Sequence, residues 1–283
     1  MRRLPVALLL TVVLAGCGGA REVDTQHSRW TPPDVCDRGG VACIDAVVAE
    51  MTRRFDPLAA TCDHQAPFAL MYLRVTEEVG REERSGSLRA DRDYLSHLDA
   101  VFARVYFDAS DAWAAGNRDA VPAAWQIAFE AAKRRRVSGI GDLLLGMNAH
   151  ISRDLPFAVA SIGLGAGRAE AFAKINTLLA GVQGAILREA SARFDPSIAG
   201  FRLPLLKVDA ATVGPLIGRW RDEALEDGRR LLRAKTSAER AAVRRRIEDN
   251  AAGRAAIIVA ATSRVPFSEA GKERDRFCAN AES

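Results

Sequence analysis

Residues 68–79 read FALMYLRVTEEV, and apolar side chains recur in this stretch every three or four positions. That spacing places Phe68, Met71, Tyr72 and Val75 on one face of an α-helix. Few alternating β-branched runs and few hairpin signals occur elsewhere. Further apolar stripes at helical spacing lie at residues 95–105, 140–147, 172–186 and 220–231, and the capping box TSAE at 236–239 starts another helix. The sequence therefore predicts an all-α fold, a single multi-helix, bundle-like domain.

Composition agrees with a folded domain and gives little guidance about partners. The chain has 283 residues, of which 48% are hydrophobic and 27% charged, which is enough to form a full core. Lys and Arg number 40 against 36 Asp and Glu, a net charge of +4. Because this excess is small, we expect no nucleic-acid partner.

The N-terminus, MRRLPVALLLTVVLAGC, has the pattern of an export signal: two arginines, an apolar run, and small residues before Cys17. The apolar run is shorter than the roughly 20 residues that a membrane-spanning helix needs. Residues 14–17, Leu-Ala-Gly-Cys, resemble the bacterial lipobox, in which the signal is removed and the cysteine is acylated. We therefore expect an exported protein that Cys17 anchors to a membrane, with an ordinary secreted protein as the alternative.

These features predict how the chain is divided. Residues 1–16 form the signal peptide, 17–39 the lipidated cysteine and a flexible tether, 40–278 the helical domain, and 279–283 a tail. The expected location is the outer face of the cell membrane or another envelope membrane.

Four cysteines remain besides Cys17, an even number that indicates two disulfides in an exported chain. Three pairings are possible. We favour Cys36 with Cys43, which closes a short loop, and Cys62 with Cys278, which ties the two ends of the domain together. Zinc is the competing interpretation, but no C-x-x-C pair occurs in the chain.

Several polar residues fall within the apolar stripes. His150 lies one turn after Met147 on the core face of its helix, and Asp154 follows one turn later on the same face. Asp99 falls within the stripe of the 95–105 helix, and Glu78 lies near the end of the 68–79 helix. Because a buried polar group without a partner is costly, these groups are expected to meet partners in the core.

Two interpretations of this cluster remain open. In the first, His150, Asp154 and Asp99, with Glu78 as a further candidate, coordinate a divalent metal or hold a water molecule for general base catalysis. In the second, the cluster is structural: Asp154 is an N-cap after a helix break at Pro156 or fixes the tautomer of His150, and Asn148 satisfies a neighbouring backbone group.

Three blocks of sequence carry a resemblance. FALMYLRVT at 68–76, LDAVFARVYFDA at 98–109 and GMNAHISRDLP at 146–156 are similar to a bacterial family known as domain of unknown function 5995. The resemblance covers roughly residues 40 to 278 and transfers no reaction. It implies a single helical domain and special importance for a set of residues: Tyr72, Thr76, Asp99, Tyr106, Asn148, His150 and Asp154.

Two function hypotheses follow. The first is a membrane-anchored envelope lipoprotein whose domain has a binding or structural role, for a protein or small-molecule partner that the sequence does not name. The second is a lipid-tethered, metal-dependent hydrolase of phosphoesters or lipids that uses His150, Asp154 and Asp99. G-x-S-x-G, H-E-x-x-H and G-x-x-x-x-G-K are absent from the chain, so whether it is an enzyme stays open.

Overall fold

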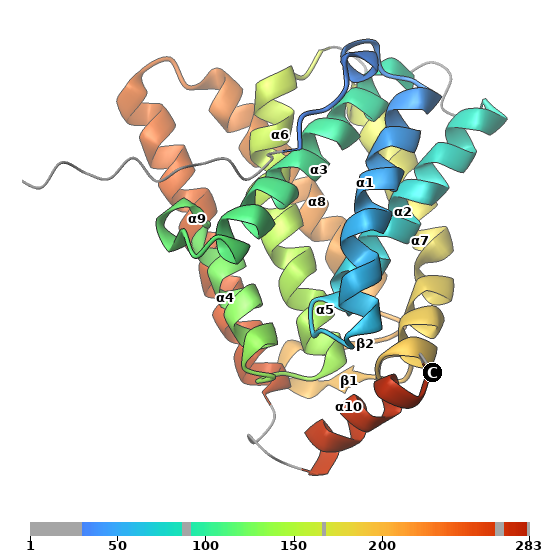
Figure 1. Cartoon of the computed structure of the whole chain (residues 1–283). Helices are drawn as coiled ribbons and strands as arrows, with labels where there is room; N and C mark the ends of the chain where they lie inside the picture. Colours follow the sequence, from blue (N-terminus) through green and yellow to red (C-terminus); the bar gives the residue numbers. More distant parts are fainter. Residues whose placement is uncertain (1–29, 87–91, 166–167, 264–268, 282–283) are drawn as a thin grey trace, which may run out of the picture.

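The computed structural model describes residues 30–86, 92–165, 168–263 and 269–281. The signal peptide, Cys17 and the first part of the tether lie outside these residues. The α-helices are α1 (Val41–Ala60), α2 (Ala66–Ser85), α3 (Arg92–Ala114), α4 (Ala123–Lys133), α5 (Gly139–Asn148), α6 (Leu155–Ile162), α7 (Arg168–Arg193), α8 (Val213–Arg233), α9 (Ser237–Thr262) and α10 (Glu269–Ala281). The prediction of an all-α fold is confirmed (Figure 1).

Short elements complete the chain. A π-helical turn, η3 (Ala149–Asp154), joins α5 to α6, and the two-residue strands β1 (Arg202–Leu203) and β2 (Val208–Asp209) pair antiparallel between α7 and α8. The structure also contains the short 3-10 helices η1 (Asp34–Arg38), η2 (Arg118–Ala120) and η4 (Pro204–Leu206).

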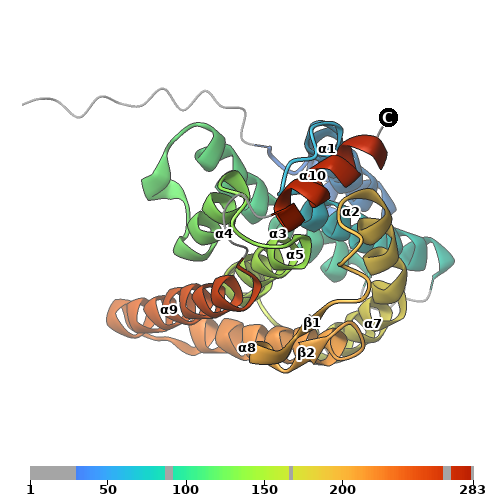
Figure 2. The same ribbon diagram turned by 90° about the horizontal axis from the view of Figure 1, so that it is seen from below.

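The helices pack around a central rod made of α5, η3 and α6. Helix α2 lies between α1 and α7 and also contacts α5, while α8 packs on α6 and α9 packs on α4 and α5 (Figures 1 and 2). One core cluster runs through these helices, from Cys36 before α1 to Cys278 in α10. The predicted apolar stripes supply much of it, including Phe68, Leu98 and Leu143.

The capping box predicted at residues 236–239 is also confirmed. Just before it, Glu226 and Arg230 form an i,i+4 ion pair along α8, with Oε1 and Nε 3.5 Å apart. Thr236 caps α9 by accepting from the backbone N–H of Glu239, whose carboxylate accepts from the backbone N–H of Thr236 in return.

Both favoured disulfides are present. Cys36–Cys43 ties η1 to the first turn of α1, and Cys62–Cys278 ties the turn after α1 to α10, across 216 residues of sequence. The second bond brings the two ends of the helical domain together, as the sequence analysis expected.

The central rod is one continuous helix that widens in the middle. Pro156 has no N–H to donate to the carbonyl of Ser152, and its ring would clash with that carbonyl in a regular α-helix. The wider π turn at η3 accommodates the proline without ending the helix. The expectation of a helix break at Pro156 is therefore wrong, and Asp154, although it precedes α6, makes no side-chain capping bond.

Among the residues that the structure describes, no helix has both the length and the apolar character needed to cross a membrane.

Candidate functional site

The π turn brings His150 and Asp154 together in the core. The ring nitrogen Nδ1 of His150 lies 3.1 Å from Oδ2 of Asp154. Only 3% of His150 is exposed and none of Asp154 is. The i,i+4 relationship on one core face was predicted from sequence, and it is confirmed.

Asp154 has partners at both oxygens. The indole Nε1–H of Trp125 donates to Oδ2 at 2.8 Å, and the guanidinium of Arg153 donates from Nη1 to Oδ1 at 3.0 Å. Arg153 also donates from Nε to Glu248 of α9 at 2.9 Å. Both oxygens of Asp154 therefore accept from N–H donors, and the neighbouring guanidinium supplies a compensating charge.

This arrangement fixes the tautomer of His150. A carboxylate cannot donate, so the proton between the two groups belongs to Nδ1 of His150. Burial lowers the pKa of His150, with the hydrogen bond to Asp154 acting in the opposite direction. The imidazole is therefore neutral near pH 7, and its Nε2 carries a lone pair. That Nε2 is buried and has no hydrogen-bond partner among the described residues.

Aromatic rings hold the imidazole in place. Phe102 of α3 stacks on it with ring centroids 3.5 Å apart and planes 7° apart, and the ring of Tyr72 lies 4.4 Å away. Phe68, Tyr106 and Trp125 surround it at about 6 Å. Gly146 lets this cage close, because a Cβ there would lie 2.3 Å from the ring of Phe68.

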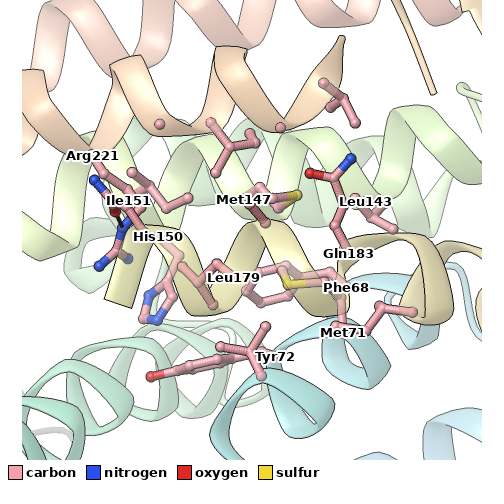
Figure 3. A pocket seen from close by; sticks show the side chains of 18 of the residues that line it. Phe68, Met71, Tyr72, Leu143, Met147, His150, Ile151, Leu179, Gln183 and Arg221 are labelled. Atoms are coloured by element: carbon pink, nitrogen blue, oxygen red, sulfur yellow. Dashed lines mark hydrogen bonds between the residues drawn. The ribbon is translucent and has the colours of Figure 1, made fainter. Parts of the chain in front are cut away.

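His150 lines a pocket between α2, α5, α7 and α8, with about 880 Å³ of empty space when the open solvent at its mouth is included. The apolar part of its lining includes Phe68, Met71, Val75, Phe102, Leu143, Met147, Ile151, Leu179, Ile186, Leu187 and Ile217. Figure 3 shows His150 and Arg221 toward one end of the pocket, with Met71 and Gln183 toward the other.

Arg221 is the cation of this pocket. It lies on α8, is 9% exposed, and donates from Nε to Oδ1 of Asn176 at 2.5 Å. It forms no ion pair with any residue in the described part of the chain, and burial lowers its pKa to about 10. Its charge also lowers the pKa values of His150 and Tyr72, and Figure 3 shows the three side chains toward the same end of the pocket. A buried guanidinium without an ion-pair partner can be stabilised by a bound anion.

Tyr72 supplies a further polar atom at the same end. It lines the pocket, and its hydroxyl is buried without a hydrogen-bond partner among the described residues. Burial, followed by the charges of Asp99 and Asp154, raises its pKa well above the usual value, so the hydroxyl keeps its proton and can donate.

A second pocket of about 520 Å³ shares Tyr72, Phe102 and Arg221 with the first and contains Asp99. Oδ2 of Asp99 is buried without a hydrogen-bond partner within the described ranges. Burial, with a smaller effect from Glu83, raises the pKa of Asp99 to about 7. Asp99 therefore carries a full negative charge only above neutral pH.

The other residues singled out from sequence have varied positions. The Nδ2 group of Asn148 donates to the backbone carbonyl of Ala251 at 2.8 Å, as the structural interpretation expected. Thr76 is fully buried, and its hydroxyl lacks a partner in the described part of the chain. Tyr106 stacks on Trp125 with centroids 5.0 Å apart. Glu78 forms an ion pair with Arg81 of its own helix instead of joining the cluster.

The donor set of the metal interpretation is not assembled. Within residues 30–86, 92–165, 168–263 and 269–281, no group of three or more His, Cys, Asp or Glu side chains could hold a metal ion. His150 and Asp154 bind each other, and Asp99 belongs to the neighbouring pocket.

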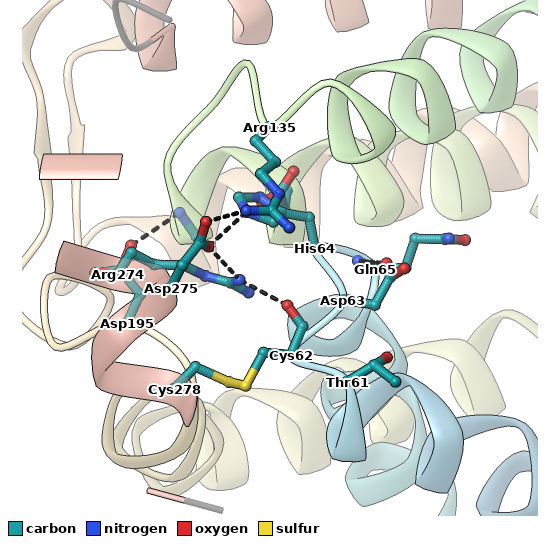
Figure 4. Close-up of polar contacts among 12 residues, drawn as sticks. Thr61, Cys62, Asp63, His64, Gln65, Arg135, Asp195, Arg274, Asp275 and Cys278 are labelled. Atoms are coloured by element: carbon teal, nitrogen blue, oxygen red, sulfur yellow. Dashed lines mark hydrogen bonds and ion pairs between the residues drawn. A yellow bond between two sulfur atoms is a disulfide. The ribbon is translucent and has the colours of Figure 1, made fainter. Parts of the chain in front are cut away.

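His64 contrasts with His150. Its Nδ1 lies 2.7 Å from Asp142 and its Nε2 lies 3.3 Å from Asp275 of α10, so both ring nitrogens are engaged (Figure 4). Arg274 adds bonds to the carbonyl of Cys62 and to Asp275. This cluster fastens α10 beside the Cys62–Cys278 disulfide and leaves His64 no ring nitrogen for a ligand.

The residues that α8 contributes to the pocket were not predicted from the sequence. Arg221 stands one turn after Ile217 and one turn before Leu225, both buried, so it interrupts an apolar stripe in the same way as His150. Gly214 and Gly218 precede Arg221 on the same face and keep the pocket open. The signal that could have identified Arg221 is a charged residue at helical spacing within an apolar stripe. Because the chain contains many arginines, this one did not stand out.

Fold and site together define an all-α domain with a buried, mainly apolar pocket that has a histidine–aspartate pair and an arginine at one end. The chain belongs to the family of unknown function DUF5995, whose model matches residues 44–261. No curated protein and no solved structure matches it.

Proposed function

We propose that this protein is an envelope lipoprotein whose helical domain binds an amphiphile with one apolar chain and an anionic head group. The observation that carries the proposal is Arg221, a buried cation without an ion-pair partner in the described residues, at one end of an apolar pocket. Burying a charge without a counter-ion is strongly unfavourable. A bound anion would remove this penalty, while the rest of the pocket excludes water from an apolar chain.

The pocket has a direction that suits such a ligand. Gly214, Gly218 and Arg221 follow one another along α8, and seven residues of helix span about 10 Å. The Gly214 end lies against Gln183 of α7, and the Arg221 end lies against Asn176, two helical turns away. The head group would accept from the outer nitrogens of Arg221 and from Tyr72 Oη, with the chain running toward Gly214.

Acylation of Cys17 remains part of the proposal. Two or three acyl chains on the N-terminus would hold the domain at a membrane, where amphiphiles are concentrated. The test is metabolic labelling with an alkyne analogue of palmitate. We expect label in the wild-type protein and none in the Cys17→Ala variant; an unlabelled wild type would contradict the anchor without bearing on the pocket.

Binding is tested on the chain from Gly18 to Ser283, which keeps every described residue. Its fluorescence titration with dansyl-undecanoic acid is followed by displacement with dodecanoate or methyl dodecanoate. We expect dodecanoate to displace the probe at least about tenfold more strongly than its uncharged ester. No probe binding, or equal displacement by acid and ester, would overturn the proposal.

A further inference from the structure

We infer that the pocket also hydrolyses carboxylic esters whose acyl chain occupies it, with His150 as the general base that activates water. This inference rests on the proposed function, because the carboxylate that Arg221 would hold is the product of the reaction.

The geometry of His150 supports this role. A general base needs a lone pair facing the substrate and a second group that fixes the other ring nitrogen. Nδ1 of His150 is fixed by Asp154 at 3.1 Å, and Asp154 is in turn fixed by Trp125 and Arg153. Nε2 belongs to a pocket-lining residue and is the ring nitrogen without a partner in the described structure. His64, by contrast, has partners at both ring nitrogens.

The pocket lining indicates water as the nucleophile. The described residues that line it include no Ser, Thr, Cys or Lys, the side chains that most often attack an acyl carbonyl. Arg221 and Tyr72 are donors that line the same pocket, and the ring of Tyr72 lies 4.4 Å from the ring of His150. We assign to them the stabilisation of negative charge on the carbonyl oxygen.

Nε2 of His150 takes a proton from water while the water oxygen bonds to the acyl carbon, and the carbonyl π electrons move to oxygen. Arg221 and Tyr72 donate hydrogen bonds to that oxyanion. The carbonyl then re-forms, the bond to the alcohol oxygen breaks, and the proton on Nε2 passes to the departing oxygen. The products are an alcohol and a carboxylic acid, and His150 is neutral again.

The test measures hydrolysis of p-nitrophenyl butyrate, octanoate and dodecanoate by the chain from Gly18 to Ser283. His150→Gln is compared with His97→Gln, a matched control: His97 is half-buried in α3, and its Nδ1 bonds to the carbonyl of Cys36. We expect kcat to fall at least about 100-fold in His150→Gln with little change in KM, and to stay at the wild-type level in His97→Gln.

A second measurement needs no variant. Burial lowers the pKa of His150 from 6.5, and a general base must be unprotonated, so kcat/KM of the wild type should fall through a protonation step below that pH. Equal rates in the two histidine variants, or a kcat/KM without a protonation step at acid pH, would overturn the inference.

The experiments distinguish a failure of the proposed binding function from a failure of the proposed ester hydrolysis. Dansyl-undecanoic acid binding without ester hydrolysis in the wild type would contradict the catalytic role and leave the binding function standing. Absence of both would contradict the binding function itself. Hydrolysis with a trapped acyl-enzyme on hydroxylamine treatment would contradict direct attack by water.

Discussion

His150 and Asp154 lie one turn apart on a π-helical turn, and the 3.1 Å hydrogen bond between Nδ1 and Oδ2 directs the other ring nitrogen of His150 away from its partner. A regular α-helix would also place residues i and i+4 on one face. The widened turn lets the helix continue across Pro156, so that His150 and Asp154 both lie within one rigid rod in the core.

Asp154→Ala is expected to destabilise the fold strongly. The change leaves Nε1 of Trp125 and Nδ1 of His150 without acceptors and removes the buried partner of Arg153. Breaking a buried charged network of this kind costs about 3–5 kcal/mol. Urea unfolding measures the loss, with Asp56→Ala on the exposed face of α1 as control. Equal unfolding free energies for the two variants would contradict the described network.

Gly218→Leu should separate ligand binding from stability. A Cβ at Gly218 meets no atom within 4 Å, so the longer side chain has room to enter the pocket. Replacing a mid-helix glycine adds helix propensity of about 1 kcal/mol. We expect unchanged or raised stability, together with loss of dansyl-undecanoic acid binding by about tenfold or more.

The matched control for this change is Gly181→Leu. Gly181 is an exposed mid-helix glycine of α7 whose Cβ would also meet no atom within 4 Å. It should gain similar stability and keep normal binding. If the two variants bind the probe equally well, the pocket between α7 and α8 is not where the ligand sits.

Asp99→Asn should change how stability depends on pH. Burial raises the pKa of Asp99 from 3.8 to about 7 in the folded chain. The unfolded chain loses this proton near pH 3.8, and the folded chain loses it only near pH 7. The free energy of unfolding therefore falls as the pH rises from the unfolded pKa through the folded pKa, and it stays low at higher pH. Asparagine mimics the protonated acid and removes this loss.

The Asp99→Asn variant should therefore match the wild type at about pH 4 and exceed it by more than about 1 kcal/mol at about pH 8. Thermal unfolding at both pH values provides the comparison. An advantage of equal size at the two values would rule out titration of Asp99 as its source.

The two disulfides should contribute unequally. In the loop-entropy model, closing the 216-residue separation between Cys62 and Cys278 stabilises by about 5 kcal/mol, and the 7-residue separation between Cys36 and Cys43 by about half as much. Double alanine variants of each pair, unfolded in urea, give the two values. A larger loss for Cys36 and Cys43 would contradict the role of the long-range bond in holding α10.

Much of the fold could be predicted because its signals are local. The stripe at Phe68, Met71 and Tyr72, the capping box at Thr236 and the i,i+4 relationship of His150 and Asp154 each depend on helical periodicity within a few residues. The cysteine pairing was constrained by number and by the position of Cys278 near the end of the chain.

The pocket could not be predicted in the same way because it depends on tertiary packing. Arg221 is 71 positions from His150, and only the packing of α8 on the central rod brings them to one pocket. Glu78 forms an ion pair with Arg81, one turn away on its own helix, and an apolar stripe does not reveal such a local partner. Pro156 causes the π turn, but the periodicity of the apolar residues alone does not distinguish a widened turn from a helix break.

The most direct test of the central claim compares Arg221→Gln with the wild type in dansyl-undecanoic acid titrations. Glutamine keeps a polar side chain and removes the charge, and Arg219→Gln on the exposed face of α8 is the control. We predict that Arg221→Gln weakens binding by about tenfold or more, raises thermal stability in the absence of ligand, and removes the preference for dodecanoate over its methyl ester. Unchanged affinity and an unchanged preference in Arg221→Gln would contradict the claim that this buried arginine holds an anionic head group.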